Sequence, residues 1–226
     1  MDRSLLLLMI AAPLLVVGLL LAGAGVAAVF GVYQVGICLL LPAALNVGAR
    51  RLGWRGHLRH LGLAGPGSGR AVAFGLALAV VCGGGTLAIF AGWGRQQLAA
   101  EAVVAALAAW GLGPQHLAGM LPLMALVSGP AEELFWRGFC ATELAAAPRW
   151  QRLLLPSLLY FSYHAVTVTA LMPQPALAAS ALAGVAGAGV GWAWLRERTG
   201  SVWPALLSHG AVAAAYTLVA VRLLGS

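Results

Sequence analysis

Charge is the scarcest property of this sequence. Only 8% of its 226 residues are charged and 62% are hydrophobic, with a mean hydropathy of +0.92, whereas a soluble domain carries roughly 25% charged residues. A soluble fold of this size has too little interior to hide so much apolar surface, so the composition excludes it. The apolar runs are continuous and rich in Leu and Ala, and they lack the short alternating segments of a membrane barrel. They therefore predict membrane-spanning helices.

Lysine is absent and cysteine is rare. The 13 basic residues are all arginine and give a net charge of +7, which in a soluble protein would suggest nucleic acid. In a membrane protein, arginines set the topology and contact anionic headgroups, so no nucleic-acid partner is predicted. The three cysteines, Cys38, Cys82 and Cys140, are too few and too scattered for a disulfide framework or a cysteine-based zinc site. We expect them to be small buried residues.

Seven apolar stretches approach or exceed the ~20 residues that a helix needs to cross a bilayer. They cover approximately residues 5–24, 29–48, 71–93, 115–144, 152–171, 175–195 and 203–223. The first two belong to one uncharged run. It begins like a signal peptide but continues to Ala49, so we expect two crossings joined by a turn near residues 23–31. The predicted fold is an all-α, polytopic bundle forming a single integral membrane domain over residues 1–226.

The arginines predict the orientation of this bundle. Cytoplasmic loops carry an excess of arginine, and a cytoplasmic N-terminus leaves only Arg95 and Arg222 on the outer side. It places the others inside: Arg3, Arg50, Arg51, Arg55, Arg59, Arg70, Arg149, Arg152, Arg196 and Arg198, with Arg137 in the inner part of its span. We therefore expect the C-terminus outside. The lysine-free, Arg- and Ala-rich composition favours a bacterial cell membrane.

Three connecting or packing segments have simple interpretations. Residues 50–62 are basic and predict a surface helix in contact with lipid headgroups, formed by Arg50, Arg51, Arg55, Arg59, His57 and His60. Residues 94–114 predict a short helix at the membrane interface. The glycines of residues 184–191 indicate close helix packing and not a nucleotide loop, since no strand accompanies them.

Three ionisable groups lie within six residues of the fourth predicted span, in the stretch GPAEELFWRGF. A charge at mid-bilayer costs at least ~2.5–3.5 kcal/mol, so such residues face a protein interior or a wet cavity. Glu133 and Arg137 are four residues apart and share a helix face, so they can pair, and the pair could simply lock the bundle. Glu132 is rotated away by about 100° and is left for chemistry, as a general base.

Two histidines lie in other predicted spans. His164 lies near the middle of the fifth span and His209 in the inner third of the seventh. Each alone is typical of a hydrogen-bonded packing residue. Together with Glu132, they could activate a water for attack on a carbonyl and donate to the developing oxyanion. The alternative is a catalytic zinc site, because Glu132, His164 and His209 match a two-histidine, one-carboxylate ligand set.

These motifs resemble those of the CPBP intramembrane proteases, the group of CAAX prenyl proteases and bacteriocin-processing or immunity proteins. The Glu-Glu-x-x-x-Arg motif is matched by Glu132, Glu133 and Arg137. The Phe-x-x-x-His motif is similar to Tyr160-x-x-x-His164, and the His-x-x-x-Asn motif begins at His209 but has Ala213 at its end. The resemblance covers about residues 115–220, which we expect to form the catalytic core.

The resemblance implies a glutamate-based endopeptidase without a metal cofactor, acting on a membrane-anchored leader, C-terminal sorting signal or CAAX-like tail. Glu132 and His164 would activate water, and His209 would stabilise the oxyanion. Ala213 cannot donate the hydrogen bond of the family's Asn. Tyr216, on the same helix face as His209, is the expected substitute, and Asn46, the sole asparagine, is a remote one. The alternatives are a non-catalytic binding or immunity protein on the same scaffold, favoured by Ala213, and a proton relay or transporter.

Overall fold

The computed structural model describes residues 3–65, 67–94 and 98–224, and its regular structure within these ranges is helical, without strands. In chain order the helices are α1 (Arg3–Leu21), α2 (Gly25–Val29), η1 (Phe30–Leu40), α3 (Leu41–Ala43), η2 (Ala44–Ala49), α4 (Gly53–His60), α5 (Ser68–Ile89), η3 (Phe90–Gly94), α7 (Ala100–Ala109), η4 (Pro114–His116), α8 (Leu117–Leu123), η5 (Met124–Ser128), α9 (Gly129–Glu133), η6 (Leu134–Cys140), α10 (Ala141–Glu143), α11 (Arg149–Leu171), α12 (Pro175–Thr199) and α13 (Trp203–Leu224). The η segments have the wide turn of a π-helix, except η4, which is a 3₁₀ turn. The predicted all-α class is confirmed.

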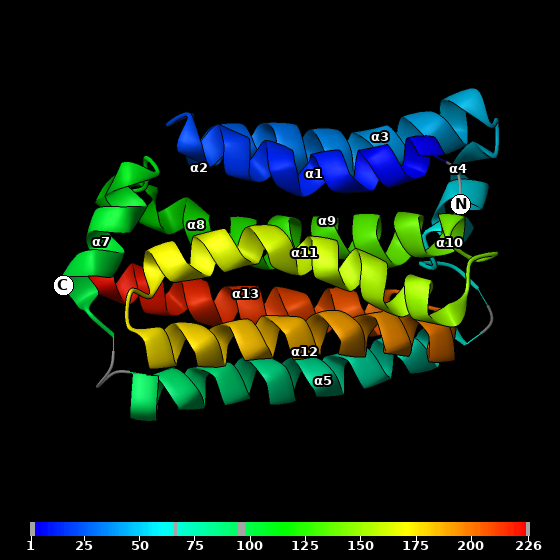
Figure 1. Ribbon diagram of the computed structural model, residues 1–226. Coiled ribbons are helices and arrows are strands. Elements are labelled where there is room, and N and C mark those ends of the chain that lie inside the picture. The colour runs from blue at the N-terminus through cyan, green and yellow to red at the C-terminus, as the bar shows by residue number, and fades with distance from the viewer. Residues whose placement is uncertain (1–2, 66, 95–97, 225–226) are drawn as a thin grey trace.

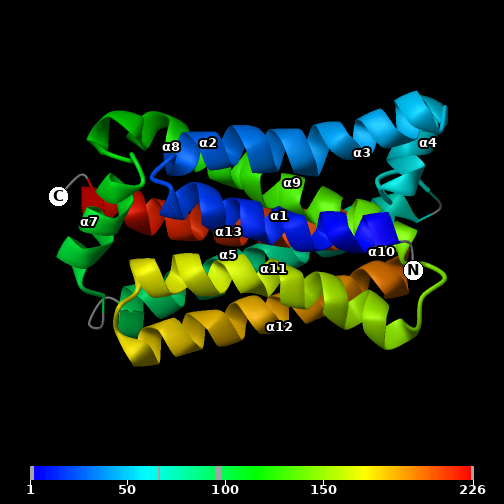
Figure 2. The same ribbon diagram turned by 45° about the horizontal axis from the view of Figure 1, so that its top comes forward.

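Six helices within the described ranges are long and apolar enough to cross a membrane. They are Arg3–Leu21, Gly25–Ala49, Ser68–Gly92, Arg149–Leu171, Pro175–Thr199 and Trp203–Leu223, and each coincides with a predicted span. The span predicted at residues 115–144 is not among them. It is a run of consecutive short helices from α8 to α10 that lies alongside the long ones in both views (Figures 1 and 2). The count of seven spans stays a prediction.

Helix α13 lies at the centre of the bundle. It packs against α5 and against the run formed by α8, η5 and α9, while α11 packs against α12 and α1 (Figure 1). Small residues let α5 and α13 approach closely. A Cβ added at Gly75 would lie 2.9 Å from the Trp203 carbonyl oxygen, and one added at Gly83 would lie 3.1 Å from the Ala211 Cβ.

Gly75 therefore provides a test of this packing. We expect Gly75→Ala to lower the free energy of unfolding by about 1–3 kcal/mol, the usual cost of overpacking. The matched control is Gly84→Ala in the same helix, where an added Cβ meets nothing within 4 Å; it should be neutral or stabilise by up to about 1 kcal/mol through helix propensity. Thermal unfolding of the detergent-solubilised protein measures both. Equal unfolding temperatures for the two variants would contradict the α5–α13 interface.

The outer surface of the bundle is apolar. Leu14, Val80 and Leu126 have relative exposures of 65%, 76% and 74%, and they lie on three different elements. Exposing such apolar side chains to water is unfavourable, whereas exposing them to lipid chains has no free-energy cost. Together with the six long apolar helices, this surface identifies an integral membrane protein.

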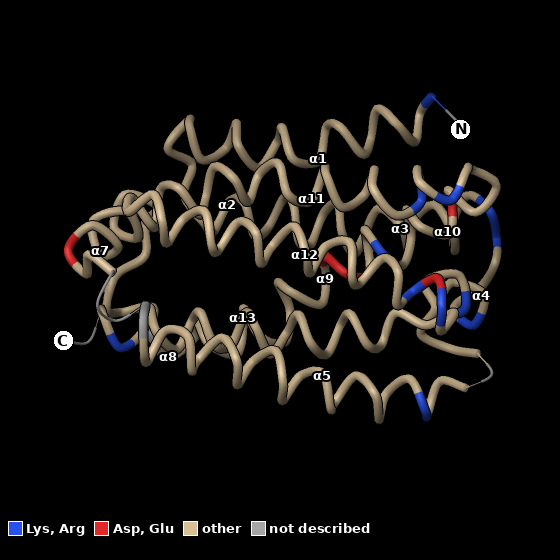
Figure 3. Tube along the Cα trace, turned by 60° about the horizontal axis from the view of Figure 1, so that its bottom comes forward, with Lys and Arg blue, Asp and Glu red and all other residues tan. Residues whose placement is uncertain are grey.

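Charged residues gather at one end of the bundle. Figure 3 shows most of the arginines at the end that holds the N-terminus, α4 and α10. The opposite end carries Arg222 in α13 and Glu101 in α7, while Arg95 lies outside the described residues. This segregation is the one used to predict the orientation, which stays a prediction because the structure contains no membrane.

The two segments between the predicted spans are helical, as expected. The short helix predicted within residues 94–114 is α7, and the basic surface helix predicted within residues 50–62 is α4. The second prediction needs one correction. His57 does not lie on the exposed basic face: it is buried and its Nδ1 is 3.1 Å from the Asn46 side-chain amide. All three cysteines are free, with Cys38 and Cys140 buried and Cys82 partly so.

Candidate active site

The acidic motif lies in the middle of the bundle, on α9 and η6. Glu132, Glu133 and Arg137 are buried there, with relative exposures of 5%, 0% and 0%. The backbone of α13 can come close because the facing residues are glycines. A Cβ on Gly210 would lie 2.6 Å from the Ala125 carbonyl oxygen, and one on Gly129 would lie 3.3 Å from the His209 ring. Two glycines thus bring the histidine of α13 onto the acidic motif of α9.

The predicted pair of Glu133 and Arg137 is present. Arg137 Nη1 donates to Glu133 Oε1 at 2.9 Å. Arg137 also donates from Nη2 to the Gly189 carbonyl oxygen at 3.0 Å, and its guanidinium lies 4.5 Å from the centre of the Tyr160 ring. A Cβ on Gly189 would lie 3.3 Å from Nη2, so this glycine of α12 makes room for the arginine. The interpretation of the α12 glycines as packing residues holds at this position.

His209 is held by the same carboxylate. Its Nδ1 lies 2.9 Å from Glu133 Oε1, and its ring stacks on Trp192 at 4.6 Å with an angle of 20°. With Nδ1 fixed in this way, Nε2 points toward the Tyr160 hydroxyl at 3.4 Å and Glu132 Oε2 at 4.0 Å. Glu133 therefore has two partners, and sequence spacing revealed only one of them.

His164 is oriented by the backbone of its own helix. Its Nδ1 lies 2.9 Å from the Tyr160 carbonyl oxygen, one turn earlier in α11. A carbonyl can only accept, so Nδ1 carries the proton and Nε2 of a neutral ring is left with a lone pair. The ring lies against Tyr160 and Tyr163, with centroid distances of 4.3 Å to both.

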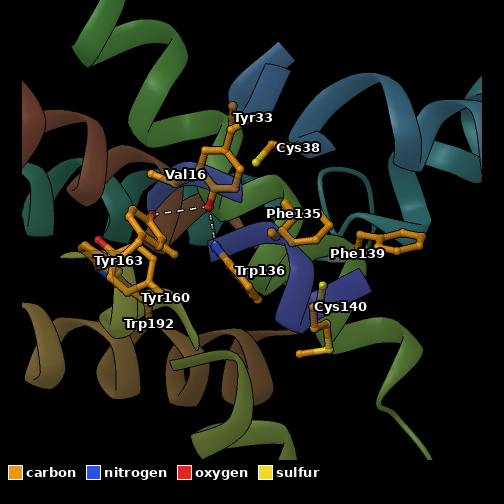
Figure 4. Close-up of a cluster of buried hydrophobic side chains, with 14 of the residues drawn as sticks. Val16, Tyr33, Cys38, Phe135, Trp136, Phe139, Cys140, Tyr160, Tyr163 and Trp192 are labelled. Carbon is orange, nitrogen blue, oxygen red and sulfur yellow. Dashed lines mark hydrogen bonds between the residues drawn. The ribbon is translucent and has the colours of Figure 1, made fainter. Parts of the chain in front are cut away.

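An aromatic cluster supports these helices from the other side. The Tyr33 hydroxyl of η1 accepts from Trp136 Nε1 at 2.9 Å and donates to the Tyr163 hydroxyl at 3.4 Å, as the dashed lines in Figure 4 show. Trp136 and Tyr163 come from η6 and α11, so one hydroxyl links three helices. The fully buried Trp136 and Tyr33 fix the depth of the acidic motif next to them.

A cavity of about 710 Å³ joins the predicted catalytic residues. Glu132, His164 and His209 all line it, whereas Glu133 and Arg137 do not. The structure thus brings the three predicted catalytic residues around one cavity and places the two supporting residues behind them. No direct contact joins Glu132 and His164 among the described interactions. Most of the cavity wall is apolar and includes Val16, Phe30, Val81, Leu107, Leu171 and Val219.

The position of the missing asparagine also faces this cavity. Ala213 lines it and offers no donor, and Tyr216 of the same helix lines it too, while the role of Tyr216 as a substitute donor stays a prediction. Tyr216 packs edge-on against Phe90, with ring centroids 5.3 Å apart. Asn46 is wrong as a candidate substitute, because it binds His57 and Arg50 near the arginine-rich end and does not line the cavity.

Gln34 is the polar cavity residue that the sequence analysis missed. It lies in η1 and donates from Nε2 to Ser128 Oγ at 3.2 Å and to Glu132 Oε1 at 3.4 Å. The signal that would have found it is its setting, a side-chain amide near the middle of an uncharged membrane span, where polar side chains are costly and usually functional.

The zinc alternative requires three ligands around one point. Within the described ranges, no group of three or more His, Cys, Asp or Glu side chains is placed to hold a metal ion. Glu132 and His209 approach each other to 4.0 Å, while His164 is directed by its bond to the Tyr160 carbonyl. Whether the site binds zinc stays a prediction, which the chelation experiment described below tests.

Comparison with known families covers the part of the chain that carries these residues. Residues 114–215 match the family described as type II CAAX prenyl endopeptidase Rce1-like. Over this segment, the chain is similar to the Rce1-like family. No curated protein and no solved structure matches the chain.

This match confirms the resemblance to CAAX prenyl proteases that the motifs carry. The Rce1-like segment contains Glu132, His164 and His209 and ends just before Tyr216. In general terms it supports a CAAX-type intramembrane endopeptidase, a hydrolase whose substrate is a membrane-associated peptide. Gln34 lies outside the Rce1-like segment, in the preceding part of the chain.

Proposed function

We propose that the chain is a glutamate-dependent intramembrane endopeptidase in which Glu132 and His164 activate a water and His209 stabilises the oxyanion. The observation that carries the proposal is the convergence of these three side chains, from α9, α11 and α13, on one cavity inside a membrane bundle. The remainder of the chain supplies the walls of that cavity and the supports of the site.

The water is activated between two acceptors. Glu132 presents carboxylate oxygens to the cavity, and His164 presents the Nε2 lone pair that its bond to the Tyr160 carbonyl leaves free. The water oxygen attacks the carbonyl carbon of the peptide bond while its proton passes to Glu132. The same proton then moves to the leaving nitrogen as the C–N bond breaks, so the products are a carboxylic acid, which keeps the second proton of the water, and an amine; transfer of that second proton to the amine gives a carboxylate and an ammonium group. A positioned general base contributes typically 10²–10⁴-fold in rate.

The oxyanion donor is His209 in its protonated form. Glu133 accepts from Nδ1, so Nε2 must carry a second proton in order to donate to the oxyanion. This assignment balances the buried charges: Glu132 and Glu133 are negative, and Arg137 and His209 are positive. An electroneutral group of four is the least costly way to keep ions at this depth. The Tyr160 hydroxyl lies 3.4 Å from Nε2 and accepts a hydrogen bond from this N–H until the substrate arrives.

The substrate class follows from the cavity wall. The wall is mostly apolar and surrounds a small group of polar side chains, so it suits a peptide whose cleaved bond lies beside a lipid group or an apolar segment. CAAX-like tails, leader peptides and C-terminal sorting signals all have this character. The surrounding lipid bilayer, in our proposal the bacterial cell membrane, delivers such a peptide to the site.

A direct cleavage assay tests the proposal. The purified chain in lipid nanodiscs is incubated with a farnesylated heptapeptide ending in a CAAX sequence, with its unmodified counterpart and with a leader peptide, and products are identified by mass spectrometry. We expect cleavage of at least one lipidated or apolar peptide, and we expect it to persist after treatment with a zinc chelator. Cleavage lost on chelation and restored by zinc would overturn the metal-free mechanism.

A cellular comparison covers substrates absent from that set. Peptide termini in membranes of cells with and without the gene are compared by mass spectrometry. A new terminus that depends on the gene identifies the substrate. Unchanged termini, together with intact probe peptides, would favour the non-catalytic binding protein that Ala213 suggests.

A further inference from the structure

Gln34 is a buried amide with a free end beside the proposed base. Its side chain is 8% exposed and it lines the same cavity as Glu132, His164 and His209. Among the described cavity residues it is the one that carries a side-chain amide. It comes from η1, so it reaches the site from outside the Rce1-like segment.

Both N–H groups of the Gln34 amide have hydrogen-bond acceptors. Nε2 has two N–H groups, and they have two acceptors: Ser128 Oγ at 3.2 Å and Glu132 Oε1 at 3.4 Å. Ser128 lies one turn before Glu132 on the same run of helix. The plane of the amide is thereby fixed relative to the carboxylate, and the position of Oε1 is fixed with it.

The acceptor end has no partner. Gln34 Oε1 is buried without a hydrogen bond from any described residue. A buried polar atom left unpaired costs roughly 1–3 kcal/mol, and the surrounding span is apolar. Because Gln34 also lines the cavity, a bound group that donates a hydrogen bond there would remove this cost.

An extended peptide supplies such donors. Every backbone N–H that enters an apolar cavity needs an acceptor, and Oε1 lies on the same planar group as the nitrogen that binds Glu132. We infer that Gln34 Oε1 accepts a backbone N–H of the bound peptide next to the bond that Glu132-activated water attacks. This inference rests on the proposed function. It makes Gln34 a substrate-binding residue that also positions the base.

The test is a double-mutant cycle between Gln34 and the peptide backbone. The farnesylated CAAX heptapeptide is compared with versions N-methylated at single backbone positions, which lack one N–H each. Binding to nanodisc protein is measured by fluorescence anisotropy in a His164→Ala background, which keeps the peptide intact. Gln34→Met removes both ends of the amide at similar length. One hydrogen bond is worth about 0.5–1.5 kcal/mol, so we expect Gln34→Met to weaken binding of the unmodified peptide by about 2- to 12-fold.

The inference is decided by the energetic coupling between Gln34→Met and N-methylation of the peptide backbone. We expect one of the methylated peptides to bind the His164→Ala protein more weakly than the unmodified peptide does, by a similar factor. Adding Gln34→Met should not weaken the binding of this peptide further, because methylation and Gln34→Met remove the same hydrogen bond. Equal losses for all peptides, methylated or not, would show that Gln34 only holds the helices together and would overturn the inference. A peptide that does not bind at all overturns it as well.

Two comparisons isolate this result. Gln174→Met is the matched control, since Gln174 also has a buried, unpartnered Oε1 but does not line the cavity; it should leave peptide binding unchanged. Cleavage is scored separately, with His164 intact. Coupling without cleavage would support the role of Gln34 in peptide binding and contradict the proposed function. Cleavage without coupling would support the proposed function and overturn the role of Gln34.

Discussion

Glu132→Gln should lower the rate of peptide cleavage by about 10²–10⁴-fold, the contribution of a general base, while the protein stays folded. Glutamine has the shape of glutamate and can still bond with Gln34, but it cannot take a proton from water. The rate is measured with the peptide that the cleavage assay identifies, and folding is followed by thermal unfolding in detergent. Glu132 lines the cavity, so a neutral side chain there leaves the packing behind it unchanged.

The control for this variant is another glutamate. Glu101→Gln changes an exposed carboxylate on α7 and should leave both the rate and the unfolding temperature as they are. If Glu132→Gln cleaves the peptide as fast as the unsubstituted protein, Glu132 is not the base. A rate that falls only together with the unfolding temperature would assign Glu132 to the structural support instead.

Arg137→Met should cost about 3–5 kcal/mol of folding free energy, because it removes the arginine that neutralises the buried carboxylate of Glu133 and leaves His209 as its remaining partner. Both side chains are fully buried and 2.9 Å apart, and Arg137 also binds the Gly189 carbonyl. The expected result is a large fall in unfolding temperature and in yield after size-exclusion chromatography. Arg55→Met, on the exposed face of α4, is the matched control and should unfold like the unsubstituted protein.

A double variant tests whether the lost stability comes from the buried charge of Glu133. In Glu133→Gln with Arg137→Met both members of the pair are neutral, so part of the lost stability should return. Cleavage should not return, because His209 loses the carboxylate that holds Nδ1. An Arg137→Met variant as stable as the control would contradict this expectation and would mean that His209 alone compensates the buried carboxylate of Glu133.

Local spacing accounts for what the sequence predicted well. The pairing of Glu133 with Arg137 follows from four-residue separation on one helix, and the long apolar runs follow from the thickness of a bilayer. Both are properties of one segment, so they can be derived without knowing which helices are neighbours. The short helices α7 and α4 are local features in the same sense.

Contacts between distant helices account for what was missed. His209 binds Glu133 across 76 residues, and Gln34 reaches Glu132 across 98. Such pairs depend on which helix faces which, and apolar periodicity is uninformative where both lipid and protein favour apolar side chains. Asn46 became a candidate because it is the sole asparagine of the sequence, but it lies near the arginine-rich end of the bundle.

The dependence of the site on η1 limits how this protein can be recombined. A chimaera that grafts residues 114–215 of one relative onto another host would carry Glu132, His164 and His209 but inherit a foreign helix where Gln34 and Tyr33 stand. Its acidic motif would lose the hydroxyl that links Trp136 to Tyr163 and the amide that meets Glu132. A chimaera should therefore be active only when residues 3–49, the helices from α1 to η2, are transferred together with residues 114–215. The two segments form one functional unit.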